Sequence, residues 1–447
     1  MLKFTDISNI LFFCLGATIT WISPVNTKIE NTKIENGTVF FDEVLPKDFI
    51  SSINTLSTVG AAISAYFYTH IADKFGRKIT ILSIGVPYLM SYLIMGIWRT
   101  VKTYFVARFV LGVAMGGTFS VIPIYAGEIS CKYNRATLNS IGGVMLAAGG
   151  LFSYVIGSLL SLDHYNLTLA FFPAIFFPLF FIFGVETAHF YMYKNQEDLA
   201  RQAFVKLRIP NEEIERELEH VVNIIKAQSQ TTMFNFIRNK VFIKVFTSVI
   251  GLLMFQQLTG INAIIMFNET IYELTESNFD SSVCCVIIGI VQFFSSLLVL
   301  TYEERFGRKT LLITSALTMS ILLTILGIHC VFLDYGIINI YLKLLPLIVL
   351  SLFVISYFIG IGPIPFVILS EIFPWRVKSI AVSVVSTIYW ITVFLIVTYF
   401  HSFATTVGPD SCFLSLAALC IICAVFVYFY VEETKGKTFE EIQEIFK

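Results

Sequence analysis

Charged residues are scarce in this 447-residue chain. Asp, Glu, Lys and Arg together make up 14% of it, and 56% of the residues are hydrophobic. A soluble protein usually carries roughly 25% charged residues, so this composition excludes an ordinary soluble domain. The sequence also has no basic block, and we therefore expect no nucleic-acid partner.

Catalytic and metal-binding patterns are also missing. The chain has six histidines, which form no metal or nucleophile cluster. The eight cysteines lie mostly in apolar runs, without the paired spacing of zinc or redox sites. We expect no metal, no cofactor and no enzymatic activity.

Long apolar runs dominate the sequence. A helix needs about 20 apolar residues to cross a bilayer, and twelve runs have that character. They lie near 8–25, 48–71, 79–98, 104–127, 138–161, 168–185, 241–272, 280–302, 310–333, 340–369, 378–400 and 412–431. The first run has no small-residue cleavage pattern, so we interpret it as a span and not as a signal peptide.

Lys and Arg concentrate in alternate loops and in the central segment. The gaps near 162–167, 273–279, 334–339 and 401–411 carry neither residue. By the positive-inside rule, both termini and the centre are predicted to be cytoplasmic. The sequons at Asn36 and Asn166 then fall outside, where we expect glycosylation. This arrangement predicts a multi-pass protein whose partner is the lipid bilayer.

The polar segment after the sixth run separates two halves. Between Glu197 and Gln228 charges alternate with apolar residues, which is typical of amphipathic helix. We expect an N-terminal six-helix bundle over 1–185, a cytoplasmic amphipathic helical linker over 186–240, a C-terminal six-helix bundle over 241–431 and a cytoplasmic tail over 432–447.

Two charged strings are nearly identical and are separated by about half of the chain. Asp73-Lys74-Phe75-Gly76-Arg77-Lys78 recurs as Glu304-Arg305-Phe306-Gly307-Arg308-Lys309. Glu128 with Arg135 recurs as Glu371 with Arg376, and Glu186-Thr187 recurs as Glu433-Thr434. These echoes predict an all-α polytopic membrane protein with 12 transmembrane helices in two pseudo-repeated six-helix bundles.

The repeated charges lie at the membrane edge, where they need partners. We expect ion pairs that bridge the two halves and hold an inner gate shut. The alternative is that each charge only anchors a helix end at the headgroups. The residues of the predicted network are Asp73, Arg77, Glu128, Arg135, Glu304, Arg308, Glu371 and Arg376.

Polar side chains inside the spans indicate a cavity, because they are costly in lipid. Gln256, Gln257 and Asn262 share one helical face only if the backbone loosens near Gly260. Amides both donate and accept, which suits an uncharged polyhydroxyl ligand; interhelical hydrogen bonding is the alternative. Gly360-Ile361-Gly362-Pro363 should break the tenth span. Further candidate binding residues are Trp21, Gln292 and Trp390.

These motifs resemble the sugar porters of the major facilitator superfamily over essentially the whole chain. Further similarity lies in Arg108, Gly362-Pro363-Ile364-Pro365 and Glu433-Thr434-Lys435-Gly436. Trp21-Ile22-Ser23-Pro24 resembles the insect branch that includes facilitated trehalose transporters. The resemblance implies that Gln256, Gln257, Asn262, Gln292 and Trp390 contact sugar. Gly143, Phe366 and Tyr389 stand where the family usually has glutamine, tryptophan and asparagine.

The first span carries no carboxylate between Ile7 and Pro24. A proton relay needs an ionisable group at depth, so we expect facilitated transport of a hexose or trehalose by alternating access. The resemblance and the sequons imply the plasma membrane. The alternatives are a proton-coupled sugar symporter and a sugar sensor that does not transport.

Overall fold

The computed structural model describes residues 7–26, 28, 49–129, 135–207, 214–215, 218, 222, 240–268, 271–272, 280–302, 306–336, 340–372 and 375–433. Every regular element in this part of the chain is a helix. The helices are α2 (Ile10–Thr20), α4 (Phe49–Phe75), α5 (Arg77–Ile97), α6 (Val101–Ile129), α7 (Arg135–Leu159), α8 (Leu162–Phe183), α9 (Ala188–Tyr193), α10 (Glu197–Lys206), α13 (Lys240–Leu258), α14 (Ile261–Met266), α16 (Ser281–Tyr302), α17 (Arg308–Asp334), α18 (Ile340–Ile359), α19 (Ile364–Ile372), α20 (Trp375–Val407) and α21 (Pro409–Tyr430).

The helices account for the twelve predicted spans. Among the described residues, 10 helical stretches are long and apolar enough to cross a membrane. The other two spans are α4 and a shorter apolar helix, Ile10–Asn26, that contains α2. The prediction of twelve membrane-spanning helices is therefore confirmed.

Two spans are interrupted where the sequence predicted a break. The seventh consists of α13 and α14, and Gly260 between them has φ +84° and ψ 7°. Only glycine adopts this left-handed conformation at little cost. The tenth span consists of α18 and α19, separated by a turn over 360–363. Its proline removes a backbone donor and prevents a continuous helix.

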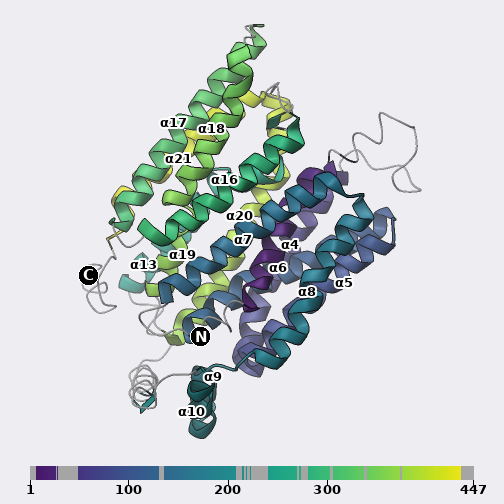
Figure 1. The fold of residues 1–447 in the computed structure, drawn as a ribbon. Helices are drawn as coiled ribbons and strands as arrows, with labels where there is room; N and C mark the ends of the chain where they lie inside the picture. The colour runs from purple at the N-terminus through teal and green to yellow at the C-terminus, as the bar shows by residue number, and fades with distance from the viewer. Residues whose placement is uncertain are drawn as a thin grey trace.

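The two halves meet through equivalent helix pairs. The second span, α4, packs against the eleventh, α20, while the fifth, α7, packs against the eighth, α16. When the spans of each half are numbered from one to six, each of these contacts joins the second span of one half to the fifth span of the other. Figure 1 shows α7 and α16 side by side, with the earlier helices on one side of this seam and α17, α18 and α21 on the other. The contacts thus follow the repeat found in the sequence.

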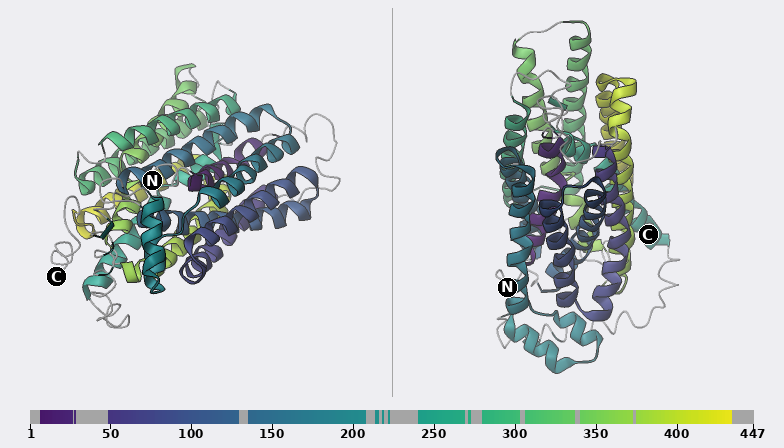
Figure 2. Two further views of the ribbon diagram at one scale, coloured as in Figure 1. Left: turned by 60° about the horizontal axis from the view of Figure 1, so that its bottom comes forward. Right: turned by 90° about the vertical axis from the view of Figure 1, so that its right-hand side faces the viewer.

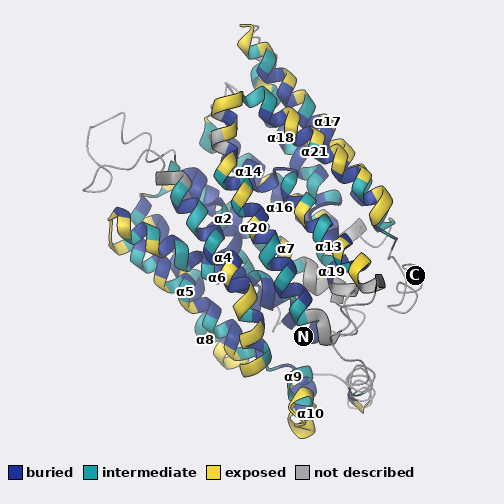
Figure 3. Cartoon of the chain, turned by 180° about the vertical axis from the view of Figure 1, so that it is seen from behind, coloured by how far each residue is buried: buried dark blue, intermediate teal, exposed yellow. Residues whose placement is uncertain are grey.

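The outer surface of the bundle is apolar. Phe181 and Ile182 on α8, Ile321 on α17 and Tyr399 on α20 are all more than 60% exposed. Exposed residues lie along the outward faces of α8 and α17 (Figure 3). Large exposed apolar side chains of this kind suit a surface that faces lipid.

Two short helices of the polar central segment lie beyond one end of the bundle. Figures 1 and 2 show α9 and α10 below the long helices and crossing their direction. Thr187 caps α9 by accepting a hydrogen bond from the Phe190 amide, at 3.3 Å. Ala200, Ala203 and Phe204 of α10 are buried, as an amphipathic helix requires.

The first and fifth spans approach each other unusually closely. A Cβ atom added at Gly149 on α7 would lie 1.9 Å from the carbonyl oxygen of Phe13 on α2. Backbone cannot yield as a flexible side chain can, so this contact requires glycine. Gly143 on the same helix has no atom within 4 Å of such a Cβ.

We predict that Gly149→Ala lowers the free energy of unfolding by about 1–3 kcal/mol, as overpacking does. Gly143→Ala is the matched control on the same helix and should leave stability equal or slightly higher. Thermal unfolding of the purified protein, followed by size-exclusion chromatography, measures both. Equal melting temperatures for the two variants would contradict the close α2–α7 contact.

Candidate functional site

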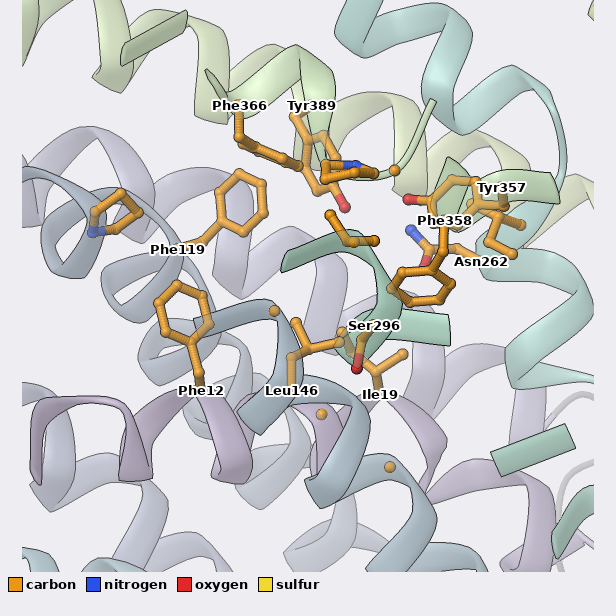
Figure 4. A pocket seen from close by; sticks show the side chains of 18 of the residues that line it. Phe12, Ile19, Phe119, Leu146, Asn262, Ser296, Tyr357, Phe358, Phe366 and Tyr389 are labelled. Atoms are coloured by element: carbon orange, nitrogen blue, oxygen red, sulfur yellow. The ribbon is translucent and has the colours of Figure 1, made fainter. Parts of the chain in front are cut away.

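A cavity of about 220 Å³ lies between the two halves. Its lining comes from α2, α6 and α7 in the first half and from α14, α16, α18, α19 and α20 in the second. Figure 4 shows side chains from both halves pointing into this space. The volume is below the roughly 300–1,000 Å³ typical of sites for drug-sized ligands. The cavity therefore suits a small ligand.

Amides and hydroxyls gather on the side of the second half. Asn262, Gln292 and Tyr389 all line the cavity. Asn262 Nδ2 donates to Gln257 Oε1. The left-handed Gly260 allows residues on both sides of the break to meet, because it turns α14 relative to α13.

Several buried polar atoms near the cavity have no hydrogen-bond partner in the described part of the chain. They are Asn9 Nδ2, Gln256 Oε1, Gln257 Nε2, Gln292 Oε1 and Trp390 Nε1. Leaving such a group unsatisfied costs about 1–3 kcal/mol. Of these atoms, Gln292 Oε1 belongs to a lining residue, so the hydroxyl of a ligand in the cavity can donate to it.

The side chain of Gln256 has different hydrogen-bond partners from that of Gln257. Its Nε2 donates to the carbonyl oxygen of Gly362 at 2.8 Å and to the Tyr357 hydroxyl at 3.1 Å. That carbonyl belongs to the broken tenth span. Gln256 is not among the described residues that line the cavity, so its amide stabilises the helix break beside the site.

An aromatic cluster joins the halves at the cavity wall. Phe119 on α6 stacks on Tyr389 with ring centroids 4.4 Å apart, and it contacts Phe366 and Trp390 edge-on at 5.2 and 5.7 Å. Trp390 lies one layer behind the lining. Offset and edge-on pairs of this kind add stability beyond burial alone.

The positions of Trp21 and Asn166 do not fit the roles predicted for them. Both side chains are fully buried, and Trp21 Nε1 donates to Asn166 Oδ1 at 2.8 Å. Asn166 Nδ2, the atom a glycan would occupy, donates to the Tyr104 hydroxyl and the Met95 carbonyl. The prediction of glycosylation at Asn166 is therefore wrong, and Trp21 packs inside the first half instead of lining the cavity. Asn36 lies outside the described residues.

Trp21 also contacts a buried arginine. The Arg108 guanidinium lies 4.7 Å from the Trp21 ring centroid, and Arg108 is fully buried. Its Nη2 donates to Asn54 Oδ1 at 3.0 Å and to the Ser57 hydroxyl at 3.4 Å. Within the described residues, every acceptor that Arg108 is bonded to is neutral.

The cavity extends toward one end of the bundle, which we call the charged end and define by Asp73, Arg77 and Glu128. Its lining includes Val299 and Leu369 near the corresponding helix ends. At the opposite end, side chains join the halves. The Tyr154 hydroxyl donates to the Ile265 carbonyl at 2.8 Å, and the Thr55 and Thr398 hydroxyls are 3.1 Å apart.

The charged end holds a compact ion-pair network. Arg77 Nη2 lies 2.9 Å from Glu128 Oε1 and 3.0 Å from Asp73 Oδ1. The Thr187 hydroxyl donates to Glu128 Oε2 at 2.6 Å. These ion pairs lie within the first half. The bridging pairs are predicted for a shut inner gate, and because the cavity extends toward this end the expectation stays a prediction. The halves are linked here by Ser379, whose hydroxyl donates to Asp73 Oδ1 at 3.2 Å.

The recurrence of Glu186-Thr187 as Glu433-Thr434 has a structural explanation. Glu186 accepts from the backbone amides of Arg77 and Lys78 at 2.9 and 3.0 Å. Glu433 accepts from those of Arg308 and Lys309, both at 3.1 Å. Each carboxylate caps the N-terminus of the third helix in its half, where free amides favour negative charge. Burial raises the pKa of the Glu186 carboxyl, and the amide donors oppose that rise.

The remaining members of the predicted network are only partly described. Arg308 is placed by its backbone contact with Glu433. Glu304 and the side chains of Arg135, Glu371 and Arg376 lie outside the described part of the chain.

A protein family described as sugar (and other) transporters matches residues 21–446. The chain belongs to this family. A relative of this sugar transporter, the facilitated trehalose transporter Tret1-2 homolog of Drosophila sechellia, is 31% identical over 83% of the chain and 77% of its own length. Facilitated trehalose transporter Tret1 of Anopheles gambiae is 31% identical over 83% of the chain, which spans 47% of that protein.

The fold of this transporter is that of the major facilitator superfamily. The solved structure of the proton:xylose symporter XylE bound to 6-bromo-6-deoxy-D-glucose superposes with a TM-score of 0.82. The match covers 100% of this chain and 99% of that one at 18% identity, a level at which the similarity establishes the fold alone. Members of this superfamily are transporters, and this chain is not an enzyme.

Several cavity residues of the transporter were not predicted as binding residues. Phe12, Phe119, Ser296, Tyr357 and Ser386 line the cavity. Aromatic and hydroxyl side chains occur along most of the spans, so their residue type does not separate those that face the cavity from those that face a neighbouring helix. Tyr389 was visible only as a departure from the family pattern.

We predict that Arg77→Ala destabilises the transporter by about 3–5 kcal/mol, because it leaves Glu128 buried without its cation. The double variant Arg77→Ala/Glu128→Gln removes that unpaired charge and should recover part of the loss. Thermal unfolding measures both. Arg99→Ala is the control, since Arg99 forms an exposed ion pair with Asp163 and should cost at most about 1 kcal/mol. A double variant no more stable than Arg77→Ala would show that the buried carboxylate is not the cause.

Proposed function

We propose that the protein carries a sugar, a hexose or trehalose, down its gradient across the plasma membrane by alternating access. The observation that carries the proposal is the cavity between pseudo-repeated halves, whose lining includes the Asn262 amide and the unsatisfied Oε1 of Gln292. Sugar hydroxyls can donate to Gln292 Oε1 and hydrogen-bond with the Asn262 amide, since both residues line the cavity. The names of the insect relatives support a sugar of this kind.

Uniport is favoured over proton coupling by the surroundings of Arg108. A proton relay within a membrane needs an ionisable acid at depth. Arg108 is instead bonded to Asn54, Ser57 and a backbone carbonyl among the described residues. These partners do not titrate in the physiological range, so they give no route for coupling protons to sugar.

The alternating units in this proposal are the halves 1–185 and 241–431, joined by the linker 186–240 and followed by the tail 432–447. The charged end with both termini faces the cytoplasm, in keeping with the Lys and Arg distribution. The cavity then extends toward the cytoplasm, while Tyr154–Ile265 and Thr55–Thr398 hold the outer side together. Outward opening requires those contacts to break and the charged ends to approach.

The proposal is tested by uptake of labelled glucose and labelled trehalose into cells expressing the full chain, at acidic and neutral external pH. We expect saturable uptake of one sugar that is unaffected by pH or by an uncoupler. Strong stimulation by acid would replace uniport with proton symport. Surface expression with sugar binding but no uptake would indicate a sensor.

We further predict that Asn262→Ala and Gln292→Ala raise the Km for the transported sugar by about tenfold, as the loss of a hydrogen bond to a bound ligand does. Thr247→Ala on the exposed face of α13 is the control and should leave the Km unchanged. Initial uptake rates, normalised to surface expression, provide the measurement. An unchanged Km in both cavity variants would remove the amide cluster from the binding site.

A further inference from the structure

The two walls of the cavity differ in chemistry, and this difference bears on the substrate proposed above. The described lining from the second half includes the polar side chains of Asn262, Gln292, Ser296, Ser386 and two tyrosines. The described lining from the first half has only two polar side chains, Asn9 and Thr20. Both halves have the same helical plan, so the contrast arises from the side chains alone.

Within the described lining, the first half offers one unpaired polar atom to the cavity, Asn9 Nδ2, and it lies at one end of the cavity. The Thr20 hydroxyl donates to the Gly16 carbonyl within its own helix, at 3.0 Å. Asn9 lies beside the start of α2, at the charged end of the cavity. Between them the wall consists of Phe12, Leu146 and other residues without polar side-chain atoms. In Figure 4, Phe12 and Phe119 lie on the side opposite Asn262 and Tyr357.

The apolar wall also contains unfilled space. Gly143 lines the cavity, and a Cβ atom built there would find nothing within 4 Å. By contrast, Gly149 and Gly16 on the same helix pair are in direct contact with backbone atoms. The opening at Gly143 is therefore not a requirement of helix packing, and it enlarges the cavity on its apolar side.

A ligand that fills this cavity meets two environments. Sugar hydroxyls facing Phe12, Leu146 and Gly143 would lose water without gaining a hydrogen bond, which is unfavourable. An apolar substituent in the same place would be removed from water, which is favourable in proportion to its area. The aromatic ring of Phe119 adds a surface on which another ring can pack.

We infer that the preferred ligand is a small glycoside. Its sugar ring is held by the amides of the second half, and its aromatic or aliphatic aglycone lies against Phe12, Phe119 and Leu146 in the space beside Gly143. The cavity volume of about 220 Å³ limits the aglycone to a small group. This inference rests on the proposed sugar site and specifies the class of sugar.

Titration calorimetry on the purified full chain tests the inference with three probes: glucose, methyl β-D-glucopyranoside and phenyl β-D-glucopyranoside. We expect phenyl glucoside to bind at least tenfold more tightly than methyl glucoside. Gly143→Gln fills the open space with a polar side chain and should reduce that ratio to below about threefold. Ser158→Gln, on the exposed surface of the same helix, should keep the ratio of the unmodified protein.

Binding of methyl glucoside in each variant reports whether the sugar site is still folded. Leu146→Asn provides a second substitution on the apolar wall and should also reduce the ratio if Gly143→Gln cannot be purified. Equal affinities of methyl and phenyl glucoside in the unmodified protein would overturn the inference and leave the sugar site standing. A tenfold ratio that neither wall variant lowers would also overturn it. Failure of all three probes, and of trehalose measured in the same way, to bind would instead refute the proposed function.

Discussion

Lipid supplies no hydrogen bonds, so each polar group within the spans has to find its partner inside the protein. This constraint explains the arrangement around both interrupted helices. The break in the tenth span frees the Gly362 carbonyl, and Gln256 donates to it from the seventh span. The seventh span is itself broken at Gly260, which allows Asn262 to reach back to Gln257. The two breaks therefore stabilise each other and leave neighbouring amides free for a ligand.

The same constraint governs the charges at the membrane edge. Glu186 and Glu433 occupy equivalent places and satisfy the free amides at the start of α5 and α17. Arg77 then neutralises Glu128 inside the first half. This network joins helices of the first half to one another, and among the described residues a hydrogen bond from Ser379 to Asp73 links the halves at this end.

Features that depend on local sequence could be predicted, and those that depend on distant contacts could not. The twelve spans, the repeat and both helix breaks follow from apolar runs, duplicated strings and the positions of Gly and Pro. Trp21 and Asn166 were misassigned because their roles depend on each other across 145 positions. A sequon specifies a residue pattern but says nothing of burial. Gln256 and Gln257 have the same side chain, and only the bend at Gly260 separates their roles.

The seam between the halves has a mechanical meaning. α4 meets α20 and α7 meets α16, and the two pairs are interchanged by the pseudo-symmetry of the repeat. Because the two pairs occupy equivalent places in the repeat, a tilt that one pair permits is also open to the other. The preference for one conformation then depends on contacts that differ between the two copies, such as those of Tyr154 with Ile265 and of Ser379 with Asp73.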